Sequence, residues 1–411
     1  MDRPPSLRHL LAFDLTARLG TANRAAEAAN LSQPAVTKAI AQLERRFGTP
    51  LFHRRSTGMY LTAAGEVLQR RVERALQHLA LAGRRLAAGG GQPRPLERLA
   101  TMAQLRALVA VGSTEGFASA ARQLGLAQPS VHRAARDLER VVGVPLFERL
   151  SHGLVLTQPG RDLARMANLA LGEIEAAGHD LAALAGTVTG RVAVGCLPLA
   201  RTEILPAAVN AVTARFPDVA VSIVEGAYEG LIAALRRGDL DLIVGALRQP
   251  PLPADIVQEP LFSDRLCVIA RPDHPLAARA TLALTDVLDW PWVAPRPNTP
   301  ARARFEQMFA LAGRMPPANV IETGSLVALR GVLMGSDRLA ILSRAQVAVE
   351  TRFGVLTVLP LDLPQTERPI GLTLRSDWVP TPLQTALVAA LRVAGHVATG
   401  LGTMAPDSEG L

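Results

Sequence analysis

The sequence predicts a multidomain protein in which two helix-rich modules of one design precede an α/β domain. The segment from Leu31 to Thr62 occurs a second time, without a gap, 95 positions further on, as Leu126 to Thr157. From Gly190 onward short apolar strands alternate with helical patterns, which is typical of a parallel sheet covered by helices. A chain of 411 residues is also too long to fold around one hydrophobic core.

Three helices are predicted at the start of the first module. Leucines recur at helical spacing over residues 6–19, and the alanine-rich stretch 22–29 predicts a second, short helix. A third helix follows, with Pro34 in its first turn, where the missing N–H costs nothing, and Gly48 at its end. We expect the hydroxyl of Ser32 to cap this helix.

A hairpin and a long helix complete the first module. Two short strands between Pro50 and Thr62 flank a turn that contains Gly58. From Ala63 to about Ala88, apolar residues form a partial stripe along one helical face. A helix of this length with an exposed stripe needs a partner helix.

The module is then repeated. The first copy spans residues 6–88, a Gly- and Pro-rich linker spans 89–95, and the second copy spans 96–186. We predict that the two long helices, residues 64–88 and 157–184, pair with each other within one chain. In the second copy an alanine, Ala127, replaces the expected serine cap, which should cost its third helix roughly 0.5–2 kcal/mol.

Charge is unevenly distributed along the chain. Residues 1–186 contain 24 Lys and Arg against 15 Asp and Glu, whereas the remaining residues contain 20 against 21. A basic half of this kind favours contact with a polyanion. The alternative is a merely soluble basic surface.

Several classes of function are disfavoured by what the sequence lacks. Cys196 and Cys267 lie far apart, with no spacing typical of a zinc site or a disulfide scaffold. A redox role for Cys196 is also disfavoured, because nothing marks Cys267 as its resolving partner. We find no motif of an enzyme or a phosphate-binding loop, so we expect no catalysis, no metal and no cofactor. No leader and no uncharged run of about 18 apolar residues occur, so we expect a soluble cytoplasmic protein without membrane contact.

The α/β part is predicted to form two lobes over residues 187–397. The first lobe takes about 187–255 and 356–397, the second about 256–355, and a disordered tail follows over 398–411. A chain that passes twice between lobes has the plan of a hinged, periplasmic-binding-protein-like domain. Ligands of such sheets lie at the carboxyl ends of the strands. The residues predicted there are Leu197, Pro198, Leu199, Ala200, Arg201, Tyr228, Gly245 and Leu247.

Both modules resemble the winged helix-turn-helix and linker helix of the LysR-type transcriptional regulators. In the first copy the matching residues are Ala25-Ala26, Leu31 to Thr37, Leu43-Glu44, Gly48, Leu51-Phe52, Arg54, Leu61-Thr62 and Ala64-Gly65. In the second they are Ala120-Ala121, Leu126, Gln128-Pro129, Val131, Leu138-Glu139, Gly143, Pro145 to Phe147, Arg149, Leu156-Thr157 and Gly160. The α/β part resembles the effector-binding domain of the same family at Gly238 to Asp241, Pro260 to Phe262 and His274 to Leu276.

The resemblance implies which residues contact DNA. The third helix of each module would read the major groove, and the hairpin would be a wing whose arginine reaches the minor groove. In the first copy these positions are Ser32, Gln33, Pro34, Ala35, Thr37, Lys38, Arg54 and Arg55, and in the second they are Gln128, Ser130, His132, Arg133 and Arg149. Thr57 departs from the family pattern, which has a second wing arginine there. Arg136 and Arg140 are expected to add charge to the second helix.

Two interpretations of the repeat remain open. Either both modules bind DNA and one chain spans two half-sites, or one copy serves only folding or dimerisation. In the first case the chain is a sequence-specific DNA-binding regulator with two heads, controlled by a small-molecule inducer. The implied partners are double-stranded DNA, an effector such as a sugar or an organic or aromatic acid, RNA polymerase, and further copies in a dimer or tetramer.

The effector itself is less clearly indicated. Arg201 or Arg248 is positioned to pair a carboxylate, although each is equally well explained as a solvated surface arginine. Tyr228 is predicted either to donate a hydrogen bond to the effector or to pack in the core. A protein that only transports or stores a solute is the alternative function, and the two basic modules count against it.

Overall fold

The computed structural model describes residues 4–88, 94–114, 116–151, 153–363 and 366–398. The chain divides into two compact units, and the main break lies between Thr189 and Gly190, with Arg237–Asp239 grouped with the first unit. Most of the predicted linker, residues 89–93, and the predicted tail from residue 399 lie outside the described residues. Within the described residues, no helix is long and apolar enough to cross a membrane.

The first module begins with a three-helix head. Its elements are α1 (Leu7–Leu19), α2 (Ala22–Ala29), α3 (Gln33–Phe47), β1 (Phe52–Arg55), β2 (Gly58–Leu61) and the long helix α4 (Ala63–Ala88). The two strands pair antiparallel, from Phe52 opposite Leu61 to Arg55 opposite Gly58, and form the predicted wing. We call α1–α3 with this wing the first head.

The prediction that the Ser32 hydroxyl caps α3 is wrong. Ser32 is the N-cap residue, but its side chain makes no capping hydrogen bond. An N-cap hydroxyl accepts from the second or third helical N–H. Here the second helical residue is Pro34, which has no N–H, and the third, Ala35, donates to the carbonyl of Ser32 at 3.0 Å. Because the Ser32 hydroxyl does not cap α3, its replacement by Ala127 in the second copy should not destabilise α8 through the loss of a cap.

The second module repeats these elements in the same order after one additional short helix, α5 (Leu96–Leu99). The repeated elements are α6 (Met102–Ser113), α7 (Phe117–Leu124), α8 (Gln128–Val142), β3 (Phe147–Leu150), β4 (Gly153–Leu156) and the long helix α9 (Gln158–Leu184). Helices α6–α8 with their wing form the second head. Equivalent contacts recur, since Glu44 accepts a hydrogen bond from the backbone N–H of Leu51 at 3.0 Å and Glu139 accepts one from that of Leu146 at 2.9 Å.

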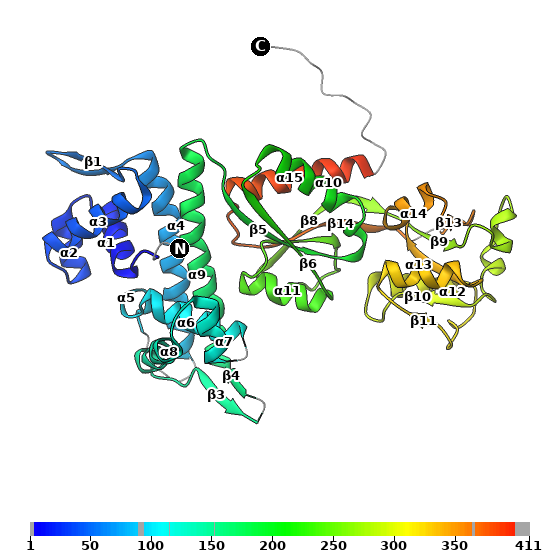
Figure 1. The fold of residues 1–411 in the computed structure, drawn as a ribbon, viewed down its shortest axis with the longest axis horizontal. Coiled ribbons are helices and arrows are strands. Elements are labelled where there is room, and N and C mark those ends of the chain that lie inside the picture. Colours follow the sequence, from blue (N-terminus) through cyan, green and yellow to red (C-terminus); the bar gives the residue numbers. More distant parts are fainter. Residues whose placement is uncertain (1–3, 89–93, 115, 152, 364–365, 399–411) are drawn as a thin grey trace, which may run out of the picture. The chain divides into compact units, whose positions relative to one another are not determined.

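Helices α4 and α9 pack along each other within the chain, as predicted (Figure 1). Arg71 Nε lies 2.7 Å from Asp180 Oδ2, and Arg74 Nε lies 2.8 Å from Glu173 Oε1. Because the partner's number falls as the α4 number rises, the two helices run in opposite directions. One hydrophobic core continues through both heads and both long helices, so the unit is built as one body.

The second unit contains two five-stranded sheets. The first lobe has the strand order β6-β5-β7-β14-β8, formed by β5 (Gly190–Cys196), β6 (Val219–Glu225), β7 (Leu242–Ala246), β8 (Ile256–Asp264) and β14 (Arg368–Arg375). Strands β5, β6 and β7 are parallel, as predicted, but β14 pairs antiparallel with its neighbours. Helices α10 (Ile204–Arg215) and α15 (Pro382–Ala398) cover one face, and α11 (Tyr228–Arg237) covers the other (Figure 1).

The second lobe is a mixed sheet with the order β11-β10-β12-β9-β13. Its strands are β9 (Leu266–Ala270), β10 (Trp292–Ala294), β11 (Ile321–Glu322), β12 (Leu339–Ser343) and β13 (Thr357–Val358). Its helices are α12 (Pro300–Leu311), α13 (Leu326–Met334) and α14 (Ala348–Arg352), with the 3-10 turns η2 (Pro275–Ala278), η3 (Leu284–Asp286) and η4 (Ala345–Val347).

The predicted lobe boundaries are wrong at both crossings. The range 256–355 was assigned to the second lobe, but β8 pairs along its length with β14 and belongs to the first. The chain crosses at Arg265, the one residue between β8 and β9. It returns only after β13, which pairs with β9, so residues from 356 do not yet belong to the first lobe. Pairing between distant strands decides both boundaries, and local sequence does not reveal it.

Candidate nucleic-acid interface and ligand cleft

Helix α3 turns a polar face to solvent and an apolar face to the core of the first head. Val36, Ile40 and Leu43 are buried, at helical spacing. On the opposite face Ser32, Gln33, Pro34 and Lys38 are exposed, and Ala35 and Thr37 are half-buried. Thr37 donates to the carbonyl of Gln33 at 3.1 Å and lies 3.4 Å from its amide nitrogen. The predicted base-reading residues thus share one accessible surface.

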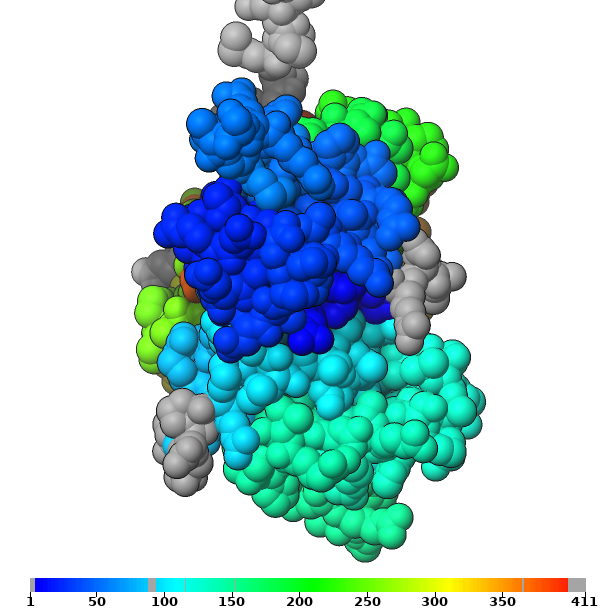
Figure 2. All heavy atoms as spheres, turned by 90° about the vertical axis from the view of Figure 1, so that its left-hand side faces the viewer, coloured from blue at the N-terminus to red at the C-terminus, as the bar shows by residue number. Residues whose placement is uncertain are grey.

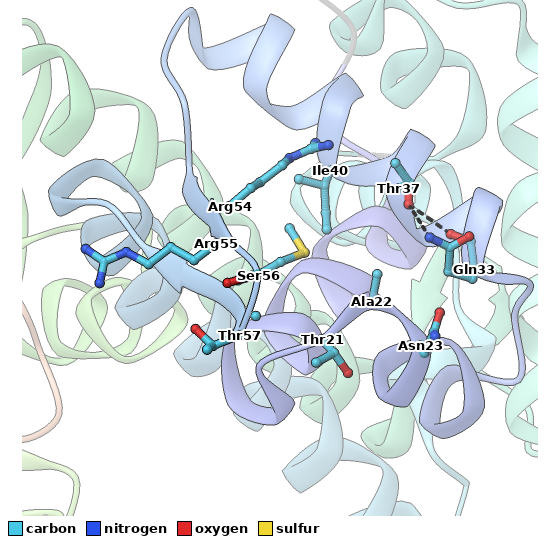
Figure 3. Close-up of a pocket in the computed structure, with 12 residues that line it drawn as sticks. Thr21, Ala22, Asn23, Gln33, Thr37, Ile40, Arg54, Arg55, Ser56 and Thr57 are labelled. Carbon is cyan, nitrogen blue, oxygen red and sulfur yellow. Dashed lines mark hydrogen bonds between the residues drawn. The ribbon is translucent and has the colours of Figure 1, made fainter.

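The wing extends this surface. Arg54 and Arg55 are exposed, and together with Gln33 and Thr37 they line a hollow of about 360 Å³ between the wing and α3. Figure 3 shows Arg54 extending from the wing towards α3, whereas Arg55 points away from it. The Arg55 guanidinium lies 5.5 Å from the centre of the Tyr60 ring. Tyr60 in turn donates to Thr57 at 3.1 Å, so the residue that departs from the family pattern supports the wing.

The second head presents the equivalent surface with different chemistry. Gln128, Ser130, His132 and Arg133 are exposed on α8, and a hollow of about 740 Å³ adjoins them. The ring of His132 meets the ring of Phe117 edge-on, with centres 4.8 Å apart. Arg149 is exposed on the wing, beside the exposed apolar Leu150.

The charge expected from two further arginines on α8 is largely balanced. Arg136 lies 2.5 Å from Glu139, and Arg140 is bonded to Asp137. Both pairs lie within one turn of the same helix. The second head is therefore less basic than its arginine count indicates. Figure 2 shows the surfaces of both heads, the first in blue and the second in cyan to green.

In the second unit the predicted cleft residues lie at the carboxyl ends of β5 and β7 and at the start of α11. The 3-10 turn η1 (Pro198–Arg201) follows β5 directly. Leu197, Leu199 and Ala200 are buried, so their side chains pack in the core, and Leu197 N donates to Val244 O at 3.0 Å. Gly245 is buried as well, while Pro198 and Leu247 are half-buried.

Three polar residues of this cleft have informative surroundings. Arg201 pairs with Glu225 at 2.9 Å, yet its Nε is buried and has no hydrogen-bond partner. The Tyr228 hydroxyl is likewise buried without a partner, and burial raises the pKa of this hydroxyl. The Arg248 guanidinium lies 4.3 Å from the centre of the Tyr228 ring, and burial lowers its pKa.

The lobes contact each other beside this cleft. Thr202, directly after η1, donates to the carbonyl of Gln346 in η4 at 3.1 Å. Asp264, at the end of β8, accepts from Ser343 of the second lobe at 2.6 Å and lies 3.3 Å from Arg368. Burial raises the pKa of Asp264, partly offset by Arg368.

Sequence reasoning missed several of these partners. Glu225, Gln258 and Gln346 were not predicted. With its amide oriented so that the nitrogen faces Arg248 O and the oxygen faces Arg248 N, Gln258 bonds both backbone groups, at 2.9 and 3.0 Å. Such contacts join segments far apart in sequence and leave no local pattern. Among the described residues no group of three or more His, Cys, Asp or Glu could hold a metal ion.

Two basic helix-and-wing surfaces joined to a two-lobed α/β unit define a class of protein that couples DNA binding to a ligand. The model of the bacterial regulatory helix-turn-helix proteins of the lysR family matches residues 7–66 and again residues 102–161, and that of the LysR substrate binding domain matches 185–395. The chain belongs to the LysR family of transcriptional regulators. It is therefore a DNA-binding regulator controlled by a small molecule, and not an enzyme.

Relatives extend this assignment. The transcriptional regulator GalR of Pseudomonas putida is 41% identical over 388 residues, which cover 94% of this chain and 97% of the relative. The regulator PcaQ of Agrobacterium fabrum is 32% identical over 298 residues, which cover 72% of this chain and 96% of PcaQ. Among solved structures, a full-length OxyR variant from Pseudomonas aeruginosa has a similar fold, with a TM-score of 0.57, 23% identity, and coverage of 72% of this chain and 94% of that chain.

Proposed function

We propose that this regulator carries a duplicated winged helix-turn-helix module and uses both copies to bind promoter DNA. The observation that carries the proposal is the pair of heads with the same elements, each exposing a polar recognition helix and a wing arginine. The family model matches the chain twice. The match to PcaQ covers 96% of PcaQ but 72% of this chain, so more than a quarter of this chain has no counterpart in PcaQ.

The proposed contacts divide by chemistry. Gln33, Thr37 and the equivalent Gln128 and His132 have the donors and acceptors needed for base edges in the major groove. Lys38 and Arg133 are suited to phosphates beside it, since they follow these positions on the exposed side of each helix. Arg54, with Arg55 next to it, and Arg149 extend from the wings, where a minor groove would lie.

Binding to the promoter region that adjoins its own gene tests the proposal. The purified chain should shift this DNA in preference to coding DNA of equal length. Affinity should fall about a thousandfold between about 50 and 200 mM salt if some six phosphates are contacted. A chain that binds neither DNA at about 50 mM salt would not be the regulator proposed here.

The effector proposed is a small polar molecule, an organic or aromatic acid or a sugar, held between lobes that hinge like those of a periplasmic binding protein. What supports this are Arg201 after β5, Tyr228 at the start of α11 and Arg248 after β7, because Arg201 Nε and the Tyr228 hydroxyl are buried and unpartnered. An acid would bond Arg201 Nε and the Tyr228 hydroxyl and compete with Glu225 for the guanidinium.

A ligand panel separates the two kinds of effector. Thermal unfolding of the full chain is measured with aromatic carboxylates, aliphatic carboxylates and sugars. An acid should raise the unfolding temperature, and Arg201→Ala should abolish the rise, whereas a sugar effector should depend on Tyr228→Phe more than on the arginine. A rise in the unfolding temperature that neither substitution reduces would show that the effector binds at another site.

Family membership alone supports the remaining parts of the proposal. These are contact with RNA polymerase at the promoter, assembly of further copies into a dimer or tetramer, and action in the cytoplasm, where bacterial DNA lies. Effector binding would change the relation of the two lobes and so the fit of the heads on DNA.

A further inference from the structure

The two long helices use equivalent positions to pair. The gapless shift of 95 residues that relates the heads also relates α4 to α9, so that Ala63 corresponds to Gln158. Buried residues on the two helices follow this shift. The buried pairs are Leu68 and Leu163, Arg71 and Met166, Val72 and Ala167, Ala75 and Ala170, Leu79 and Ile174, and Ala82 and Ala177. The packing is therefore that of two related helices about a pseudo-twofold axis.

Charge breaks this symmetry at one position. Arg71 is almost fully buried, with 4% of its side chain exposed, and it bonds both Glu173 at 2.9 Å and Asp180 at 2.7 Å. The position related to Arg71 by the shift holds Met166, and the positions related to those carboxylates hold His78 and Arg85. An ion-pair cluster thus exists on one side of the axis, and no acidic residue occupies the related positions on the other.

This arrangement selects which helices pair. If α4 paired with α4 of a second copy, Arg71 would face His78 and Arg85, and like charges would meet. If α9 paired with α9, Glu173 and Asp180 would face Met166, and two mostly buried carboxylates would lack their cation. Only α4 with α9 brings Arg71 and Arg74 against Glu173 and Asp180.

The heads held by this pair differ where they face DNA. Ala35, Thr37 and Lys38 of the first head correspond to Ser130, His132 and Arg133 of the second. A hydroxyl and a methyl at one site are replaced by an imidazole at the other, so the two helices cannot prefer the same base edges. Because one core runs through both heads, their relative orientation is fixed.

From these observations we propose that one chain recognises a non-palindromic DNA site, made of two unlike half-sites in one fixed orientation. The inference rests on the proposed function, in which both heads bind DNA. It goes beyond it, because two identical heads, or two chains paired through like helices, would read a palindrome.

Selection from random duplexes tests the inference with the full chain. The wild type should enrich a site whose two halves differ. Converting the contact positions of the second recognition helix into those of the first by Ala127→Ser, Ser130→Ala, His132→Thr and Arg133→Lys should make the base preferences of the two halves alike. The reciprocal change, Ser32→Ala, Ala35→Ser, Thr37→His and Lys38→Arg, should give a different site whose halves are again alike. In the second head all four positions are exposed and in the first they are exposed or half-buried, so the variants keep the fold.

Each result has a defined meaning. An unlike pair of half-sites that becomes symmetric in both conversions supports the inference. A palindrome selected by the wild type overturns it, and so does an unlike pair that neither conversion alters. If the wild type enriches no sequence at about 50 mM salt, the proposed function itself fails, and this outcome is distinct from selection of a palindrome.

Discussion

The two modules keep the same residue at a position where the backbone leaves no room for a side chain, and they differ at positions of the recognition helices. Gly65 and Gly160 start the long helices, and a Cβ at either would lie 2.2 Å from the carbonyl oxygen of Leu51 or Leu146. No larger residue fits there. On the recognition helices, by contrast, the equivalent positions hold the half-buried Thr37 and the exposed His132, so a different residue type is accommodated at each.

Ser32 is predicted to contact DNA but does not cap its helix, so replacing it should leave the stability of the fold almost unchanged. Because the Ser32 hydroxyl makes no capping bond, Ser32→Ala should change the free energy of unfolding by less than about 0.5 kcal/mol. Thr157 is the matched control, since it accepts from Gly160 N at 3.1 Å and donates to Pro145 O at 2.8 Å. Thr157→Ala should cost about 1–2 kcal/mol in urea denaturation. Equal losses in the two variants would mean that Ser32 caps α3 after all.

The two cysteines should react slowly in the folded chain. Burial, the largest effect at each, raises the pKa of Cys196 to about 11 and that of Cys267 to about 12. The reactive thiolate is therefore scarce at neutral pH and should increase only as the pH approaches these values. Iodoacetamide labelling of the native protein should be far slower at pH 8 than labelling of the urea-unfolded protein. Equal rates would show that the native thiols are accessible and ionised.

At the scale of elements, local sequence patterns predicted the helices and strands well. They predicted only part of how these elements pair with one another. The long helices α4 and α9 and the wings were predicted because stripes, turns and caps lie close together in sequence. The partner of β8 was missed, since β14 lies about a hundred residues downstream and no local signal joins the two strands. The cap of Ser32 failed for a different reason, because the N–H of Ala35 donates to the carbonyl of Ser32 and not to its hydroxyl.

The ion pairs between α4 and α9 provide a test at this scale. Arg71→Ala should lower the free energy of unfolding by on the order of 3 kcal/mol, because it leaves Glu173 and Asp180 mostly buried with less compensating charge. Arg70 is its exposed neighbour on the same helix, and Arg70→Ala should cost less than about 0.5 kcal/mol. Denaturation of the full chain measures both. Losses of the same size would mean that the Arg71 pairs do not hold the helices together.

At the scale of the whole molecule, the sequence predicted a DNA-facing surface and a ligand cleft, with the residues of each. The DNA-facing residues came from the resemblance to a family, and the cleft residues came from the rule that ligands lie at the carboxyl ends of strands. What the sequence did not reveal were contacts across the fold, such as Arg201 with Glu225 and Arg248 over Tyr228. The same holds for the one-sided placement of Arg71, whose partners lie about a hundred residues away.

The central claim is that both heads of one chain engage DNA, and the wing arginines test it most directly. Affinity and footprint are measured on the same promoter DNA for Arg54→Ala, Arg149→Ala and the double variant. Arg279→Ala, an exposed arginine of the other unit, is the control.

Each single wing substitution should weaken binding about tenfold, reduce the salt slope by about one, and relax protection at one half-site only. The double variant should lose protection of both. If Arg149→Ala leaves affinity, salt slope and footprint unchanged while Arg54→Ala reduces them, the second head does not bind DNA and the claim is contradicted.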